Sequence, residues 1–121
     1  MPLMSKLSIT TNLERNMNME TINNGMRPIH PGEVLREEFI RPLRITAHAL
    51  SMSLQVPAPR IHEILHERRS VTVDTALRLA KYFGTSAEFW LGLQNDYDMA
   101  IARSTMSEAL ARIGRCELTA A

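Results

Sequence analysis

Hydrophobic and polar positions divide the chain into a polar beginning and a helical remainder. Residues 1–25 contain the run SITTNLERNMNMETINNG, which is polar, rich in Asn and Thr, and lacks a sustained apolar stripe. From Met26 onward, apolar residues recur at intervals of three and four, the spacing of one helix face. We therefore expect a flexible extension over residues 1–25 unless a partner orders it, with Met26 as a candidate alternative or true translation start.

Five helices are predicted in the remainder. Thr46, Thr72 and Ser86 suit N-caps, because their side-chain oxygens can accept from a free backbone N–H. Pro42 has no N–H to donate and is expected to stop the first helix, whereas Gly84 suits the left-handed position that ends the fourth. The expected helices span about residues 31–41, 47–53, 57–67, 73–83 and 87–104. The predicted fold class is all-α.

Each predicted helix has an apolar face. On the first, this face contains Val34, Leu35 and Phe39; on the fourth, Val73, Ala76, Leu77, Ala80 and Phe83; on the fifth, Trp90, Leu93, Tyr97 and Ile101. The fifth stripe has two interpretations. Trp90, Leu93 and Tyr97 form part of the core, which is the commoner outcome for such a stripe, or they contact a second copy of the chain or a partner protein. Trp90 can do both if the fifth helix packs against its symmetry mate.

The second and third predicted helices have the pattern of a helix-turn-helix. This unit requires apolar residues that lock two helices together at a steep angle. Ser51 is small, which allows the two helices to approach closely. The residues at the required apolar positions are Leu50, Leu54, Val56, Ile61 and Ile64.

If Ile61 and Ile64 face the core, the opposite face of the third helix is exposed and can contact DNA. Arg60 can make two parallel hydrogen bonds to guanine, and His62 can offer a donor or an acceptor to a base edge. Arg68 and Arg69 follow the helix where phosphates would pass, and the helix beginning at Thr46 can present free amides to another phosphate. The predicted DNA-binding residues are Thr46, Ala47, Pro57, Ala58, Arg60, His62, Glu63, His66, Arg68 and Arg69.

The same helix contains His62-Glu63-Ile64-Leu65-His66, which matches the H-E-x-x-H pattern of zinc metalloproteases. Only three positions are fixed, so chance matches are common. Arg69 and Thr72 occupy the downstream positions where the extended motif needs Gly and His. About 95 structured residues also leave little room for a catalytic cleft beside a core. We expect no catalytic residue, no cofactor and no metal site, although the two histidines share a face that can bind metal incidentally.

Two stretches resemble a known family. HPGEVLREEFIRPLRIT and VPAPRIHEILHERRSVTVDTALRLAKYFGTSAEFWLGLQNDYD closely resemble HigA-type antitoxins, a branch of the Cro-like helix-turn-helix repressors, over about residues 28–103. The resemblance implies a five-helix, lambda-repressor-like domain over residues 26–104, followed by a tail over residues 105–121. It implies a homodimer that binds a palindromic operator, represses its own operon and neutralises a HigB toxin, a RelE-like ribonuclease acting on ribosome-associated mRNA. The implied recognition helix, about residues 57–66, agrees with the packing pattern.

Several positions depart from this family. Gln55 stands where many relatives have Gly in the tight turn; a left-handed conformation there costs a non-Gly residue about 1 kcal/mol. Ala58, Pro59 and His62 replace Arg, Gln and Asn, so the DNA sequence read is expected to differ from that of close relatives. Ala47 replaces a Gln and removes one possible phosphate contact.

Charge and cysteine content are consistent with this function. The net charge is only +1, but residues 26–83 hold nine Arg or Lys against six Asp or Glu, and residues 84–121 hold three against five. A basic centre suits nucleic acid and an acidic end suits a basic protein, although ordinary scatter gives the same counts. One cysteine, Cys116, and the lack of a long apolar run indicate a cytoplasmic protein outside the membrane. Two alternatives remain, a free-standing repressor without a toxin and a toxin-binding module with negligible DNA binding.

Overall fold

The computed structural model describes residues 27–117, so the expected extension over residues 1–25 lies outside the described residues. Within residues 27–117 the chain is helical and has no strand. The elements are α2 (Pro31–Val34), the π-helix η2 (Leu35–Ile40), α3 (Arg41–Leu43), α4 (Ala47–Leu54), α5 (Ala58–Leu65), α6 (Val73–Phe83), α7 (Ala87–Thr105) and α8 (Ser107–Ala111). The predicted helices are confirmed, and α8 adds a helical turn inside the expected tail.

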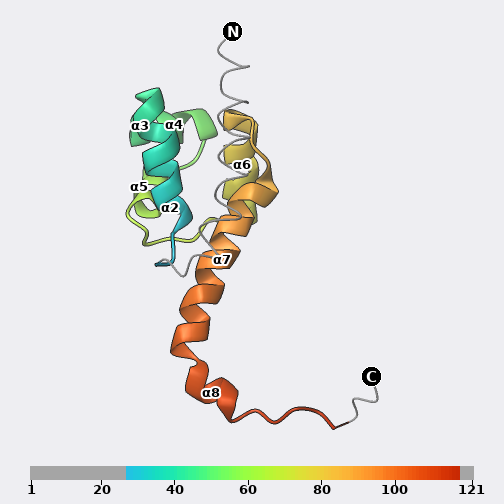
Figure 1. Ribbon diagram of the computed structural model, residues 1–121. Helices are drawn as coiled ribbons and strands as arrows, with labels where there is room; N and C mark the ends of the chain where they lie inside the picture. The colour runs from blue at the N-terminus through green and yellow to red at the C-terminus, as the bar shows by residue number, and fades with distance from the viewer. Residues whose placement is uncertain (1–26, 118–121) are drawn as a thin grey trace.

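The helices pack around one core. In Figure 1, α2 through α5 lie on one side of the domain, α6 packs beside the first half of α7, and α7 then continues beyond the body to α8. The buried apolar residues come from α2, η2, α4, α5, α6 and α7, together with Val71 before α6. The largest of those with no exposed surface are Trp90, Leu35, Leu50, Ile61, Ile64 and Leu79. No helix in the described part of the chain is long and apolar enough to cross a membrane.

The first helix does not stop at Pro42 as predicted. It runs through residues 31–43 and ends at Arg44, which is left-handed with a φ of 56°. Residues 35–40 form wider π turns, in which the Arg41 N–H donates to the Arg36 carbonyl. A proline in a regular α-helix collides with the carbonyl four residues earlier and leaves it without a donor. The wider turn just before Pro42 changes that spacing, so the helix passes through the proline.

The other helix ends agree with the sequence pattern. The side-chain oxygens of Thr46, Thr72 and Ser86 each accept from the backbone N–H three residues later, at 3.0, 3.4 and 3.0 Å. Gly84 ends α6 with a φ of 76°. Gln55 ends α4 in the left-handed region with a φ of 59°, as its place in the tight turn predicted. Local capping chemistry therefore sets most element boundaries.

The predicted inner face of α6 was partly wrong. Val73 and Leu77 are 59% and 56% exposed, although both were expected in the core. The buried positions of this helix are Thr75, Ala76, Leu79 and Phe83. Thr75 and Leu79 were not part of the predicted face, which was therefore rotated away from the face that is buried. Both stripes have helical spacing, and only the neighbouring helices decide which of them is covered.

His30 caps the first helix from a buried position. Its Nδ1 accepts a hydrogen bond from the Gly32 N–H at 2.9 Å, and its ring meets the edge of Tyr97 with centroids 4.9 Å apart. Burial lowers the pKa of His30, while Glu67 and Asp98 act weakly in the opposite direction. The neutral imidazole is the form that accepts the Gly32 hydrogen bond.

This burial predicts a pH dependence of stability. As the pH falls below about 6.5, the unfolded chain protonates His30 before the folded chain does, so the folded state loses stability. Replacing His30 with Asn keeps an N-cap acceptor but removes the titration. We expect the melting temperature of the wild-type chain to fall between pH 7 and pH 5. That of H30N should fall less, because unfolding of this variant no longer includes the uptake of one proton by His30. Equal pH profiles would contradict the prediction.

Candidate nucleic-acid interface

Helices α4 and α5 form the helix-turn-helix that the apolar pattern predicted. Leu50, Leu54, Ile61 and Ile64 are each at most 4% exposed, and the half-buried Val56 packs against the same core. Ser51 is 2% exposed, and its hydroxyl donates to the His48 carbonyl at 2.6 Å. These contacts fix the orientation of α5, leaving its other face at the surface.

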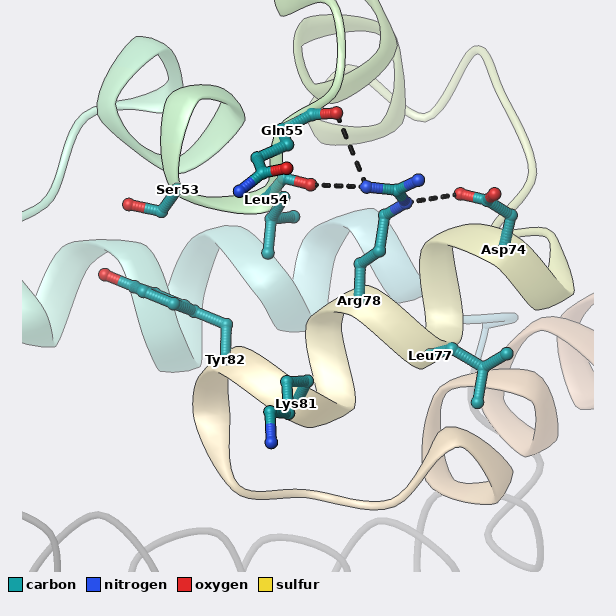
Figure 2. A pocket seen from close by; sticks show the side chains of 8 residues that line it. All are labelled: Ser53, Leu54, Gln55, Asp74, Leu77, Arg78, Lys81 and Tyr82. Atoms are coloured by element: carbon teal, nitrogen blue, oxygen red, sulfur yellow. Dashed lines mark hydrogen bonds and ion pairs between the residues drawn. The ribbon is translucent and has the colours of Figure 1, made fainter.

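The turn between the two helices is closed by backbone hydrogen bonds and by an arginine from α6. The Gln55 and Val56 N–H groups donate to the carbonyls of Met52 and Ser51, both at 3.1 Å. Figure 2 shows Arg78 reaching from α6 toward this turn, where its Nη1 donates to the Leu54 carbonyl at 2.8 Å and to the Gln55 carbonyl at 3.4 Å. Arg78 therefore satisfies carbonyls at the end of α4, which the helix itself leaves without donors.

Sequence reasoning did not identify this function for Arg78. Its position four residues after Asp74 was a usable signal, since residues at that spacing are neighbours on a helix surface. The Arg78 Nε donates to Asp74 Oδ1 at 2.7 Å. The contact with the turn carbonyls depends on how α6 packs against α4, which no local pattern reveals.

The beginning of α5 differs slightly from the prediction. Pro57 is the extended N-cap residue, with φ −62° and ψ 142°, rather than part of the first turn. Pro59 lies inside the first turn, as expected, where a missing N–H costs no hydrogen bond. Ala58 follows Pro57 and is half-buried. The two prolines restrict the backbone at the end of the helix that would approach DNA.

None of the predicted DNA-binding residues is buried. Thr46, Pro57, His62, His66, Arg68 and Arg69 are exposed, and Ala47, Ala58, Arg60 and Glu63 are half-buried. His66 is the C-cap of α5, and its Nδ1 lies 2.8 Å from the His62 carbonyl oxygen. His62 is the exposed polar side chain nearest the middle of the helix.

Arg60 has a partner that the sequence analysis did not anticipate. Its Nη1 donates to Asp74 Oδ1 at 3.0 Å, and its side chain is only 28% exposed. The pKa of Asp74 lies below its usual range, first because Arg78 hydrogen-bonds to this carboxylate and also because Arg60 does. Arg60 therefore cannot be treated as a freely rotating base reader, because one of its donors is already engaged.

The two arginines after α5 differ in their pairing. Arg69 forms an ion pair with Glu63 at 2.7 Å. Among the described residues Arg68 has no ion-pair partner, so its positive charge is the more available of the two. A small hollow of about 190 Å³ lies beside them and is lined by Arg60, Arg69, Ser70, Thr72, Asp74 and Thr75.

The H-E-x-x-H pattern lies in this same surface. Glu63, which would be the general base of a metalloprotease, is paired with Arg69. Within residues 27–117, no three His, Cys, Asp or Glu residues are grouped so that they could hold a metal ion.

Two of the three proposed partner contacts lie in the core. Trp90 has 0% exposed surface and Leu93 has 5%, so neither offers a surface to a partner, and the core interpretation holds for both. The centroid of the Trp90 ring lies 5.1 Å from the ring centroids of Phe39 and of Phe89. Its Nε1–H donates to Thr85 Oγ1 at 2.8 Å. Tyr97 is half-buried and contacts His30.

The exposed apolar surface of this end of the chain lies further along. Beyond Tyr97, α7 and α8 project from the body (Figure 1) and have no buried residue within the described chain. Their exposed apolar side chains are Met99, Ile101, Met106, Leu110 and Ile113. We call this projecting segment, residues 98–113, the arm. From the sequence pattern, Ile101 was expected in the apolar stripe of the fifth helix and residues 105–121 in a tail.

Comparison with known proteins gives the family. No protein-family model matches the chain. It is 49% identical to virulence-associated protein I of Dichelobacter nodosus over 86 residues, which cover 71% of this chain and 80% of that protein. It is 32% identical to antitoxin HigA-1 of Vibrio cholerae over 82 residues, covering 68% and 77% of the two chains.

Solved structures give the same result. The structure of Pseudomonas aeruginosa antitoxin HigA with the higBA promoter is similar with a TM-score of 0.72 and 41% sequence identity, covering 76% of this chain and all of that one. This relative was solved with promoter DNA. The helix-turn-helix, the sequence identity and the coverage agree, and the chain belongs to the HigA family of helix-turn-helix antitoxins.

Proposed function

We propose that this protein is a sequence-specific DNA-binding repressor that also acts as the antitoxin of a HigB-type toxin. The observation that carries the DNA-binding part is the outward face of α5, which the Gln55 turn and the buried Ile61 and Ile64 hold at the surface. The solved relative with promoter DNA supports this assignment. We propose a binding protein of the cytoplasm, where operator DNA is found, rather than an enzyme.

The surface divides into residues that would read bases and residues that would hold phosphates. His62 is exposed on α5 and can pair with a base edge, with Ala58 and Glu63 beside it on the same face. Arg68 and Arg69 would contact phosphates, and so would the amides at the beginning of α4 after Thr46. Phosphate contacts release counterions, so affinity should weaken steeply with salt.

We further propose a homodimer. Paired recognition helices related by a dyad would enter successive major grooves about 34 Å apart and favour a palindromic operator. The arm supports this proposal, because it carries exposed Met106, Leu110 and Ile113 and has no buried residue within the described chain. Exposed apolar side chains gathered on a projecting segment are typical of a protein–protein contact, and a second copy of the arm would cover them.

The toxin is the second proposed partner. Exposed carboxylates on the arm and at the end of the body, Asp98 and Glu108 among them, suit a basic protein. The antitoxin name of the Vibrio cholerae relative supports this proposal. Co-expression with the product of a neighbouring toxin gene should yield a stable complex and relieve toxicity. Growth arrest despite co-expression would leave the free-standing repressor as the better description.

The DNA-binding proposal is tested by selecting bound duplexes from a randomised pool and sequencing them. We expect a palindrome with half-sites about one helical turn apart. Failure to enrich any sequence would favour the toxin-binding module with negligible DNA affinity. Two variants then distinguish the phosphate-contacting residues from the base-reading residues. Arg68→Ala should keep the selected sequence but reduce the salt slope of log affinity by about 0.9, whereas His62→Ala should change the preferred bases.

A further inference from the structure

One carboxylate oxygen connects the recognition helix, the turn and α6. Asp74 Oδ1 accepts from Arg60 on α5 at 3.0 Å and from Arg78 on α6 at 2.7 Å. Arg78 in turn donates to the Leu54 and Gln55 carbonyls at the end of α4, as Figure 2 shows. Asp74 itself is placed by the first turn of α6, which Thr72 caps and which Ala76 anchors in the core.

We propose that Asp74 is a positioning residue for DNA reading, acting through Arg60. This inference rests on the proposed DNA-binding function and identifies a residue that controls its specificity. An arginine side chain has five N–H donors and many rotamers, so a single fixed acceptor removes much of its freedom. Asp74 engages only Nη1 of Arg60, and the other nitrogens keep donors for a base or a phosphate. The arginine is thereby oriented before DNA arrives.

The charge of Asp74 has a second effect. The carboxylate lines the same small hollow as Arg60, Arg69, Ser70 and Thr72, beside the surface where phosphates would pass. There it partly neutralises Arg60 and repels a phosphate, so it weakens binding that depends on charge alone. Without Asp74, Arg60 would be free to neutralise any phosphate within reach, whatever the DNA sequence. Asp74 should therefore favour specific over nonspecific complexes.

The molecule contains a matched control for the structural effect of losing this carboxylate. Asp74 is the second residue of α6 and Glu88 is the second residue of α7, and both helices begin at a hydroxyl cap. Each carboxylate lies near the positive end of a helix dipole, which it stabilises. Among the described residues, Glu88 has no arginine partner and is exposed. A change at Glu88 therefore reports the loss of helix stability alone.

The experiment compares the full-length wild-type chain with Asp74→Ala, Asp74→Glu and Glu88→Ala. Dissociation constants are measured for the selected operator and for a scrambled duplex of equal length over a range of salt concentrations. We define the specificity ratio as the dissociation constant for the scrambled duplex divided by that for the operator. For Asp74→Ala we expect this ratio to fall roughly tenfold, the size of one lost base contact. Binding to the scrambled duplex should be unchanged or tighter, with a salt slope steeper by about 0.9. Asp74→Glu should restore most of the ratio, and Glu88→Ala should leave it unchanged.

Three results would overturn the inference. The first is that Asp74→Ala weakens binding to the operator and to the scrambled duplex equally, and the second is that its specificity ratio is unchanged. The third is that Glu88→Ala lowers the ratio as much as Asp74→Ala does. If Asp74→Ala loses its helical circular dichroism, Asp74→Asn keeps the shape and an accepting oxygen, and its ratio should fall in the same direction. A wild-type chain that does not discriminate between the duplexes would instead refute the proposed function itself.

Discussion

Replacing Trp90 with alanine is expected to lower the free energy of unfolding by about 3–5 kcal/mol, the usual cost of deleting a buried aromatic side chain. Trp90 has no exposed surface and packs against Phe39 from the first helix and Phe89 from its own helix. The change would leave a cavity between these helices and remove the donor to Thr85. A loss of this size approaches the total stability of many small domains.

Denaturation by urea, followed by circular dichroism at fixed protein concentration, measures this loss. Trp90→Phe is the matched control, because it keeps an aromatic ring in the site and loses the Nε1–H donor, whose net contribution is about 1 kcal/mol. We expect the phenylalanine variant to lie between the wild-type chain and the alanine variant. A loss well below 1 kcal/mol in Trp90→Ala would show that this residue is not part of the core.

The second large effect is expected at Gly32, where α2 meets the end of the recognition helix. A Cβ built on Gly32 would lie 1.8 Å from the Ile64 carbonyl oxygen and 3.1 Å from His30 Nδ1. The first of these is a backbone atom, so that contact is relieved only by moving α2 away from α5. Gly32→Ala should therefore cost about 1–3 kcal/mol of stability, the range for overpacking a close-packed site. Because Ile64 anchors α5, operator affinity should fall as well.

Gly92 provides a control with the opposite expected sign. It lies within α7, and a Cβ placed there meets nothing within 4 Å. Glycine in the middle of a helix is less favourable than alanine, so Gly92→Ala should stabilise the chain by about 0.5–1 kcal/mol. Melting temperatures of the two variants, measured at the same protein concentration, test the pair. Similar shifts in both would show that Gly32 is not a point of close helix contact.

The helix-turn-helix illustrates how far sequence reasoning reached. Leu50, Leu54, Ile61 and Ile64 were recognised from spacing alone, and all four are buried. A helix-turn-helix has a nearly invariant pattern of contacts between consecutive helices, so local spacing carries most of the information. The left-handed Gln55 was expected from the family resemblance instead, because many relatives have Gly at this position of the turn.

The surface assignments depended more on tertiary packing. Arg60, Arg68 and Arg69 looked alike in the sequence as basic residues in or near the recognition helix. In the structure, Arg60 is bound by Asp74 and Arg69 is paired with Glu63, so that of these three arginines only Arg68 has no ion-pair partner within the described residues. Asp74 is fourteen residues from Arg60 along the chain. Such pairs form only after α5 and α6 have packed, so helical periodicity does not reveal them.

The sequence by itself determined the properties that arise within a few residues: the helix ends set by Thr46, Thr72, Ser86 and Gly84, the left-handed Gln55, and the spacing that marks α4 and α5 as a helix-turn-helix. Only the tertiary structure decided which apolar residues are covered. It exposed Val73 and Leu77, buried Trp90 completely, and brought Asp74 to Arg60. The physical reason is that capping and periodicity depend on neighbouring residues, whereas burial and ion pairing depend on which helix lies opposite.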